Sequence, residues 1–403
     1  MKRTQYNRSW FRSLLAVWQR EFRLVFKDAG VILFFLVLPT AYPILYTLMY
    51  NPELIKDVPV VVLDDSRTPE SREITRMLDA TEAMKVAGYV SDMAEGKRAI
   101  AERKANAIIS IPYDYAERLG RGEQAYIDFF SETSRLLRYR GFVSAITDVT
   151  IQAGAQIQAH KLDEAGATTL LTGNLTPMPV KSEAIFTGDP TQGFASFVLP
   201  GILVIILQQS LLLGITMIGG GVSERARANG GTDPLSIPAP PSATVLGKTL
   251  CYIVIYIPMA IFGLHYVPLI FNLPHLAGVF EALTLIMPML LASIFLGLML
   301  QYFSRERESS LLIVVFTSPL VLFLTGLTWP RFAMNGFWYT ISSFFPATWG
   351  VNAFIRMNGS GTQLYLQNYD VIALWLLALC YFAGAYMVQR LYFRRMEPAL
   401  VKT

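Results

Sequence analysis

Residue types that perform most enzyme chemistry are few in this chain and poorly spaced for catalysis. The three histidines, His160, His265 and His275, are scattered, and no H-E-x-x-H pattern is present. Asp64 and Asp65 form an adjacent carboxylate pair, which could in principle hold a metal ion. They follow a short β-branched run, however, and this position is more typical of a turn and a helix cap. With no Ser/His/Asp set either, the sequence does not favour an enzyme.

The two cysteines, Cys251 and Cys380, both lie inside apolar runs. Such cysteines are usually small buried hydrophobic residues. Two isolated cysteines of this kind indicate neither a disulfide framework nor a metal site. We therefore expect no metal on this chain.

One segment comes close to a phosphate-binding loop. Residues Ser242–Thr249 read S-A-T-V-L-G-K-T, so the first glycine of G-x-x-x-x-G-K-[ST] is missing. The segment also leads into an apolar run, whereas a true phosphate loop follows a strand and opens a helix on a sheet. We interpret Lys248 as a lysine at the membrane surface whose stem lies along apolar groups. The sequence thus predicts no nucleotide site on this chain.

Three consecutive polar residues, Gln208, Gln209 and Ser210, stand in the middle of a long apolar run. Polar groups are costly in a membrane and usually face a partner or a cavity. These three residues could line a substrate path or could form hydrogen bonds between helices, and the sequence does not choose between the two. Glycines at 214 and 219–221 in the same run predict close approach of neighbouring helices.

The elements that position these residues are membrane spans. Of the 403 residues, 53% are hydrophobic and only 16% are charged, and the charges are concentrated between long apolar runs. Each run is long enough to cross about 30 Å of hydrocarbon as a helix, the form that satisfies its own backbone groups in lipid. The six predicted spans are Ala29–Tyr50, Phe194–Ile218, Thr249–Ile270, Glu281–Phe303, Ser309–Leu327 and Val371–Leu391.

Lysine and arginine are concentrated before the first span, after the second and fourth, and in the tail. By the positive-inside rule this places both termini in the cytoplasm. The first run is too long for a signal peptide and lacks an A-x-A site, so we interpret it as retained. Residues 1–28 are then predicted to form an interfacial amphipathic helix on the cytoplasmic side. Residues 29–50 form the first span, and residues 392–403 form a cytoplasmic tail. The alternative is that the leader simply extends the first span.

Residues 51–193 contain no span and predict an extracytoplasmic domain. Strand candidates at 58–63, 85–90, 107–111 and 125–130 alternate with helical stretches at 69–78 and 93–103, which is typical of an α/β unit. A long helix over 138–162 would form a stalk, and 177–185 is a further strand candidate. The predicted fold class is a membrane all-α protein with six spans and an α/β (α+β) external domain between the first two.

This layout resembles the permease subunits of ABC exporters of the "type 2" family. The cytoplasmic segment 222–248, with a charged run, Gly-Thr, an acidic position, leucine, a proline and a later Gly-Lys, is similar to the family's coupling loop. Pro234 allows only a short coupling helix, capped by Thr232 or Asp233 and ended by Pro238. The resemblance implies ATPase-coupling roles for Glu224, Arg225, Gly231, Thr232 and Leu235.

A second match follows the fifth span. Residues 328–370, within the block of five spans at 194–391, carry Trp329-Pro330 and then Phe345-Pro346-Ala347-Thr348-Trp349. The family has a re-entrant pair of short helices here on the outer side. The resemblance therefore implies an outer re-entrant segment marked by Pro330, Pro346 and Trp349.

The resemblance further implies that ATP and magnesium bind to separate ATPase subunits, with no cofactor on this chain. The expected partners are those ATPases, a second permease chain and the lipid bilayer, and no nucleic acid; a periplasmic adaptor is left open. The expected function is export of an amphipathic, lipid-like or drug-like substrate across a bacterial inner membrane. The alternative is a membrane-anchored sensor or assembly scaffold that acts through its external domain; a membrane-embedded enzyme lacks a catalytic pair in the spans.

Overall fold

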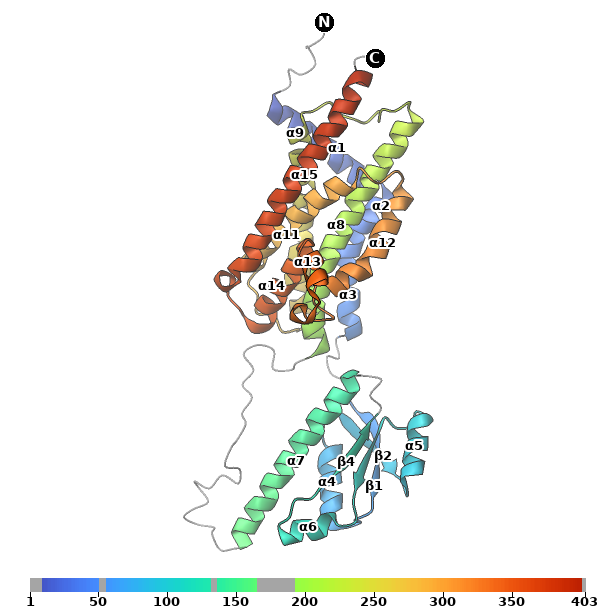
Figure 1. Ribbon diagram of the computed structural model, residues 1–403, viewed down its shortest axis with the longest axis vertical. Helices are drawn as coiled ribbons and strands as arrows, with labels where there is room; N and C mark the ends of the chain where they lie inside the picture. The colour runs from blue at the N-terminus through green and yellow to red at the C-terminus, as the bar shows by residue number, and fades with distance from the viewer. Residues whose placement is uncertain (1–8, 51–55, 132–135, 165–192, 401–403) are drawn as a thin grey trace. The chain divides into compact units, whose positions relative to one another are not determined.

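The computed structural model describes residues 9–50, 56–131, 136–164 and 193–400. The chain forms two compact units, one from Leu54 to Ile185 and one from the remaining residues. Each unit is described by itself. The larger unit is a bundle of helices and the smaller unit is built on a sheet (Figure 1).

Among the described residues, six helical segments are long and apolar enough to cross a membrane, which confirms the predicted number. Their ends differ from the predicted ends chiefly because polar turns extend several helices beyond the apolar run. The segments are α2–η1–α3 (Ala29–Ile32, Leu33–Val37, Leu38–Tyr50), α8 (Phe194–Ala228), α9–η2–α10 (Pro241–Ile261, Phe262–Tyr266, Val267–Ile270), α11 (Val279–Leu300), α12 (Arg307–Leu324) and η4–α15 (Leu364–Gln367, Asn368–Leu400).

The centre of the bundle is α8, which is the most buried of the six spans. Its glycines explain how other elements come close to it. A Cβ on Gly214 would lie 1.7 Å from the Phe35 ring, and one on Gly220 would lie 2.6 Å from the backbone oxygen of Glu306. The predicted role of this glycine run in close approach is therefore confirmed.

Two of the spans contain a π-helical turn, and each turn lies just before a proline. The turn η1 is centred on Phe35, four residues before Pro39, and η2 is centred on Leu264, four residues before Pro268. Proline has no N–H to bond the carbonyl four residues earlier. The wider turn therefore occurs where the regular helical hydrogen bond is lost.

The leader forms a helix of its own, α1 (Trp10–Lys27). It ends because Asp28 adopts an extended conformation, and the Asp28 carboxylate then caps α2 by accepting from the N–H groups of Gly30 and Val31. One face of α1 is buried against α9, where Gly247 lies beneath the backbone of Leu14. A second, apolar face is exposed and fits the predicted contact with lipid; its members are Trp10, Phe11, Leu15 and Phe26.

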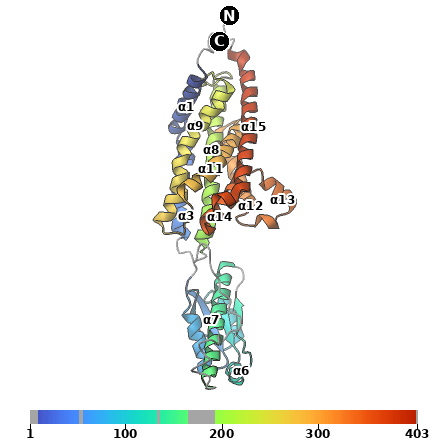
Figure 2. The same ribbon diagram turned by 90° about the vertical axis from the view of Figure 1, so that its left-hand side faces the viewer.

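Two short helices follow the fifth span, as the resemblance implied for 328–370. After the single turn η3 (Arg331–Ala333) come α13 (Gly336–Ser342) and α14 (Pro346–Ser360). Figure 2 shows α13 projecting from the side of the bundle, whereas α14 is buried against α8 and α11. Pro346 is the first residue of α14, where its missing N–H costs nothing.

The smaller unit contains a four-stranded sheet in the order β2-β1-β3-β4. The strands are β1 (Val58–Asp64), β2 (Met84–Tyr89), β3 (Ala107–Ile111) and β4 (Asp128–Ser131), and only the β3–β4 pair is antiparallel. The helices are α4 (Pro69–Asp79), α5 (Met93–Ala101), α6 (Tyr115–Arg121) and α7 (Leu136–Glu164). The strands predicted at 58–63, 85–90, 107–111 and 125–130 and the three predicted helices are thus present, with shifted ends, and α6 is additional.

Side chains of β1 point alternately into two apolar clusters. Val60 and Val62 pack with residues of α4, α6 and α7, while Val61 and Leu63 pack with residues of α5. A strand covered on both faces reads as a continuous apolar run, as this one does. Phe142 of α7 is buried in the first cluster, so the N-terminal half of the predicted stalk helix is part of the core of this unit. The strand candidate at 177–185 lies outside the described residues.

Asp64 closes the turn after β1. Its carboxylate accepts from the backbone N–H of Arg67 at 2.9 Å and from the Ser71 hydroxyl at 2.7 Å, and Thr68 caps α4. The interpretation of this carboxylate as part of a turn is confirmed. No cluster of three or more potential metal ligands occurs among the residues that the structure describes.

Candidate functional site

Buried charges are concentrated at one end of the helix bundle, which we call the terminal end. It comprises α1, the last turns of α8, the loop 229–240, the start of α9, the 301–306 turn and the last described turns of α15 (Figure 1). The end that carries α14 and the 271–278 loop is called the opposite end. The expected coupling residues all lie at the terminal end.

The first group of charges is centred on Glu21 of α1, whose side chain is completely buried. Its carboxylate accepts from the Tyr252 hydroxyl at 2.5 Å and pairs with Lys248 at 3.3 Å and with Arg20 at 3.5 Å. Burial by itself would raise the pKa of Glu21, but the two cations and the hydroxyl outweigh it, and the pKa is lowered. The lysine also donates to Gln301, the residue that follows α11, at 3.1 Å.

This geometry corrects the sequence-based interpretation of Lys248. Instead of extending to the membrane surface, its ammonium group is buried in an ion pair with α1. The neighbouring Gly247 permits the contact because a Cβ there would lie 2.8 Å from the Leu14 carbonyl oxygen. The Gly-Lys pair that resembles part of a phosphate loop therefore joins α9 to α1.

Arginine 20 extends the group to the loop between α8 and α9. It donates to Asp233 at 2.9 Å, and Arg225 of α8 donates to the same carboxylate at 3.0 Å. The carboxylate also accepts from the backbone N–H of Leu235 at 3.2 Å. Although burial opposes ionisation, the bonds from Arg225 and Leu235 and the charge of Arg20 hold the pKa of Asp233 below its ordinary value. A single carboxylate thus fixes the loop to both α1 and α8.

The loop itself contains no helix between Asn229 and Pro240, all of which the structure describes. The prediction of a short coupling helix that begins at Pro234 is therefore wrong. Gly230 and Gly231 have φ angles of +72° and +103°, and Asp233 forms a turn with Leu235 instead of a helix cap. The tip exposes Leu235 to solvent.

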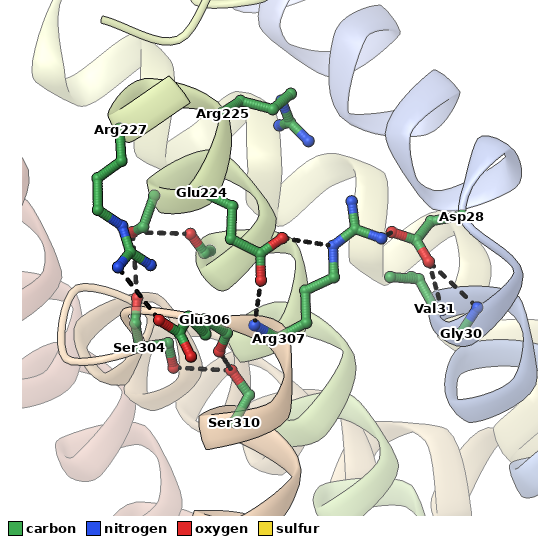
Figure 3. Close-up of polar contacts among 12 residues, drawn as sticks. Asp28, Gly30, Val31, Glu224, Arg225, Arg227, Ser304, Glu306, Arg307 and Ser310 are labelled. Atoms are coloured by element: carbon green, nitrogen blue, oxygen red, sulfur yellow. Dashed lines mark hydrogen bonds and ion pairs between the residues drawn. The ribbon is translucent and has the colours of Figure 1, made fainter. Parts of the chain in front are cut away.

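The second group of charges surrounds Arg307, the first residue of α12 (Figure 3). Its guanidinium pairs with Asp28 at 2.7 Å and with Glu224 at 3.3 Å, and its backbone N–H donates to Glu224 at 2.8 Å. Nearby, Arg227 pairs with Glu306 at 3.1 Å. The group therefore joins the α1–α2 junction, the end of α8 and the start of α12.

The expected coupling residues consequently divide into two sets. Glu224 and Arg225 are on the last turns of α8 and hold neighbouring elements, and Figure 3 shows that they point in different directions. Gly231, Thr232 and Leu235 lie at the tip of the loop. The sequence alone did not identify Arg20, Glu21 and Asp28 as members of a site. Their charges on an otherwise apolar helix could have indicated buried ion pairs.

The three mid-span polar residues point to different neighbours. Gln208 accepts from the Ser293 hydroxyl at 3.3 Å and from the backbone N–H of Ala347 at 2.6 Å, so it holds the start of α14. Ser210 and the Tyr256 hydroxyl lie 3.0 Å apart. Gln209 is also buried, and neither its side-chain oxygen nor its nitrogen has a hydrogen-bond partner among the described residues. Gln208 and Ser210 therefore bond between helices, and Gln209 remains a candidate for the path.

At the opposite end, Trp349 of α14 is fixed by a hydrogen bond and a cation–π contact. Its indole N–H donates to the Ser343 carbonyl at 2.9 Å, and the Arg331 guanidinium lies 4.5 Å from the ring. Pro330 precedes the turn that carries Arg331. The three residues expected to mark the re-entrant segment therefore lie within or beside α13 and α14.

Comparison with known proteins assigns the family. The family model described as ABC-2 family transporter protein matches residues 29–387, which is most of the chain. No curated protein sequence matches the chain at a significant level. The match covers the first five spans, the sheet unit and most of the sixth span, whereas Arg20, Glu21 and Asp28 lie just before it. The chain therefore belongs to the ABC-2 family of transporter proteins, whose members are membrane components of ABC transporters that associate with an ABC ATPase.

Proposed function

We propose that this protein is the permease subunit of an ATP-driven exporter, and that its separate ATPase subunit docks on the loop 229–240. The observation that carries the proposal is the attachment of this loop through Asp233 to Arg20 of α1 and Arg225 of α8. A load applied to the exposed tip would be transmitted through these bonds to two helices of the bundle. From Arg20 it continues through Glu21 to Lys248 and α9.

The docking contact would use the apolar side chain of Leu235. It is 49% exposed, and its backbone N–H is bonded to the Asp233 carboxylate, so the apolar side chain is available to a groove on a partner. Gly231 and Thr232 would let the partner approach the backbone of the tip. The permease needs no helix within the loop for this contact, because the end of α8 and the start of α9 already support the loop.

The test is copurification with a coexpressed ABC ATPase subunit from the same source. We expect Leu235→Glu to abolish copurification and permease-stimulated ATP hydrolysis while leaving the thermal unfolding midpoint of the purified permease unchanged. The matched control is Leu366→Glu, because Leu366 is also exposed, at 66%, but lies at the opposite end. Normal association of the Leu235 variant would contradict the docking proposal.

The proposed cargo is an amphipathic, lipid-like or drug-like molecule, moved out of the cytoplasm or inner leaflet. The described residues around the middle of α8 carry no charge, and the uncommitted amide of Gln209 would contact the polar part of such a cargo. In inside-out vesicles with the ATPase present, Gln209→Leu should lower ATP-dependent uptake of a fluorescent amphiphile. Gln209→Asn should retain more of it. Equal uptake by the two variants would show that the Gln209 amide does not contact the transported molecule.

A second copy of the permease is the proposed partner within the membrane. α12 exposes large apolar side chains along one side, and α13 adds exposed aromatic rings beside them; the α12 members are Leu312, Phe316, Leu320 and Phe323. Phe316→Cys in a Cys380→Ser background tests this face by disulfide formation, because the other cysteine, Cys251, is buried. A cross-linked dimer in native membranes supports the proposal, and a monomer under oxidising conditions contradicts it.

A further inference from the structure

A cavity of about 130 Å³ lies inside the terminal end of the bundle. One water molecule needs roughly 10–15 Å³ by this measure, so the cavity can hold a group of several atoms. Its walls come from α1, α8, the loop before α9, α9, the 301–306 turn and α15. The polar part of the wall is formed by Arg20, Lys248, Gln301, Tyr302, Gln389 and Tyr392.

The charges beside the cavity do not balance. Three cations, Arg20, Arg225 and Lys248, share two carboxylates, those of Glu21 and Asp233. No further carboxylate of the described residues pairs with any of the three. One positive charge is therefore in excess in this group, of which Glu21, Asp233 and Lys248 are buried and Arg20 and Arg225 are partly exposed. A partly buried charge without a counterion is unfavourable.

The excess charge is presented toward the cavity. Two of the three cations, Arg20 and Lys248, line it, whereas Glu21 and Asp233 do not. Lys248 uses its ammonium group for Glu21 and Gln301, which leaves one of its three N–H donors for a ligand. The guanidinium of Arg20 likewise has more donors than its two carboxylate partners use.

The rest of the wall is apolar and aromatic. Val222, Ile237, Pro238 and Phe393 stand beside the polar groups. α1, with its exposed apolar face, passes the same site, and Arg20 of this helix is part of the wall. A ligand with an anionic group and an apolar extension would therefore contact the polar wall with the first and the apolar wall with the second.

We propose that this cavity binds an anionic phosphate group, with Arg20 and Lys248 as its cationic contacts. The phosphate supplies the negative charge that the group of five side chains lacks. An amphiphile carrying a phosphate monoester at its head fits the mixed wall, and a free phosphate shares the same chemistry. The inference does not depend on transport, because it concerns binding by the permease chain alone.

The experiment measures thermal unfolding of the full-length chain in detergent with three probes. These are dihexanoylphosphatidic acid, dihexanoylphosphatidylcholine and inorganic phosphate, each titrated at constant ionic strength. We expect a saturable rise in the unfolding midpoint with phosphatidic acid and none with phosphatidylcholine, whose headgroup is neutral overall. A rise with inorganic phosphate at similar concentrations would assign the site to a soluble oxyanion, and its absence would assign it to a lipid.

Two variants separate the site from general effects. Ser236→Trp fills the mouth of the cavity from an exposed loop position and leaves all five charges in place; Lys248→Met keeps the cavity and removes the excess charge. Both should weaken binding of phosphatidic acid at least tenfold. The matched control, Gln363→Trp, is an exposed loop position at the opposite end and should bind normally.

The proposal is overturned if phosphatidic acid and phosphatidylcholine shift the midpoint equally. It is also overturned if Ser236→Trp binds phosphatidic acid as tightly as the unaltered chain does. Because Ser236 makes only a backbone bond to Asp233, a folded Trp variant is expected, and its unfolding midpoint without ligand checks this.

Discussion

The two ends of the helix bundle are held together by different chemistry. At the terminal end, α1, α8, α9 and α12 are joined by buried or half-buried ion pairs around Glu21, Asp233 and Arg307. At the opposite end one ion pair, Arg356–Asp370, joins α14 to α15. The turn η2 is joined to α14 by hydrogen bonds, since His265 and His275 lie 2.7 Å apart and His275 lies 2.6 Å from the Asn358 oxygen. Removing one member of a buried ion pair leaves the other charge buried and unpaired. Removing one member of an uncharged hydrogen-bonded pair leaves only an unsatisfied polar group, which costs less.

This difference suits the proposed docking of an ATPase at the terminal end. A loop that receives a force from a partner requires strong attachments, and a carboxylate shared by two arginines supplies one. The hydrogen bonds around His275 are weaker, at about 0.5–1.5 kcal/mol each. The following predictions test the contrast, beginning with the largest expected effect.

Removal of Glu21 should be the most damaging single change. Glu21→Ala leaves Lys248 and the Tyr252 hydroxyl buried without their partner, which typically costs about 3–5 kcal/mol of stability. Thermal unfolding of the purified chain measures the loss. The matched control is Glu73→Ala in the α/β unit, where both partners of the Glu73–Arg76 pair are exposed and little change is expected.

A double variant identifies the cause. Glu21→Leu combined with Lys248→Met replaces the buried pair by apolar groups of similar size and should recover much of the stability lost by Glu21→Ala. If the double variant is as unstable as the single one, packing of α1 on α9, and not the unpaired charge, controls this end. The comparison between the two ends would then lose its electrostatic basis.

Close packing distinguishes the ends in a second way. Gly220→Ala would place a Cβ 2.6 Å from the Glu306 carbonyl oxygen and 2.8 Å from the Arg307 nitrogen, and backbone atoms cannot rotate away. We expect a loss of about 1–3 kcal/mol. At the opposite end, Gly359→Ala in α14 has no atom within 4 Å of the new Cβ and should gain up to about 1 kcal/mol. A loss at both positions would show that helix packing is equally tight throughout.

Much of the fold could be predicted from local sequence, because its signals are local. A span is a long apolar run, and the strands of the smaller unit are short β-branched runs between turns. The prediction failed where structure depends on distant pairing. Nothing near Lys248 indicates that Glu21, far away in the chain, will neutralise it, so an exposed lysine was the natural interpretation.

The coupling loop shows the same limit in a different form. The resemblance suggested a short helix between Pro234 and Pro238, whereas the structure has turns there, with Gly230 and Gly231 at positive φ. Gln208, Gln209 and Ser210 were recognised as unusual from their position alone. Which of them bonds to a neighbour could be determined only when α9, α11 and α14 were placed around α8.

Acid should weaken the opposite end selectively. Burial, together with the nearby His265, lowers the pKa of His275 even though Asn358 acts to raise it. A base with a lowered pKa in the folded state contributes stability that is complete above its unfolded value, about 6.5, and is lost as the pH falls through the folded value. Hydrogen exchange of the 271–278 loop should therefore accelerate below about pH 6.

His275→Gln provides the control for this titration, because glutamine retains a donor for Asn358 and does not titrate. Its exchange in this loop should be independent of pH after correction for the intrinsic rate. If the variant and the unaltered chain show the same acid response, another group controls this end. The acid response of the terminal end should appear only at lower pH, since the pKa values of Glu21 and Asp233 are lowered.

The smallest effect should come from a charge at the terminal end that is not buried. Arg227 and Glu306 form an ion pair with 55% of each side chain exposed, so water already solvates both partners. Arg227→Ala should change stability by no more than about 0.5 kcal/mol, measured by thermal unfolding at low and high salt. The 3–5 kcal/mol expected for Glu21→Ala comes from the same kind of pair in the same region. A large loss at Arg227 would therefore mean that the number of charges, and not their burial, makes the terminal end different.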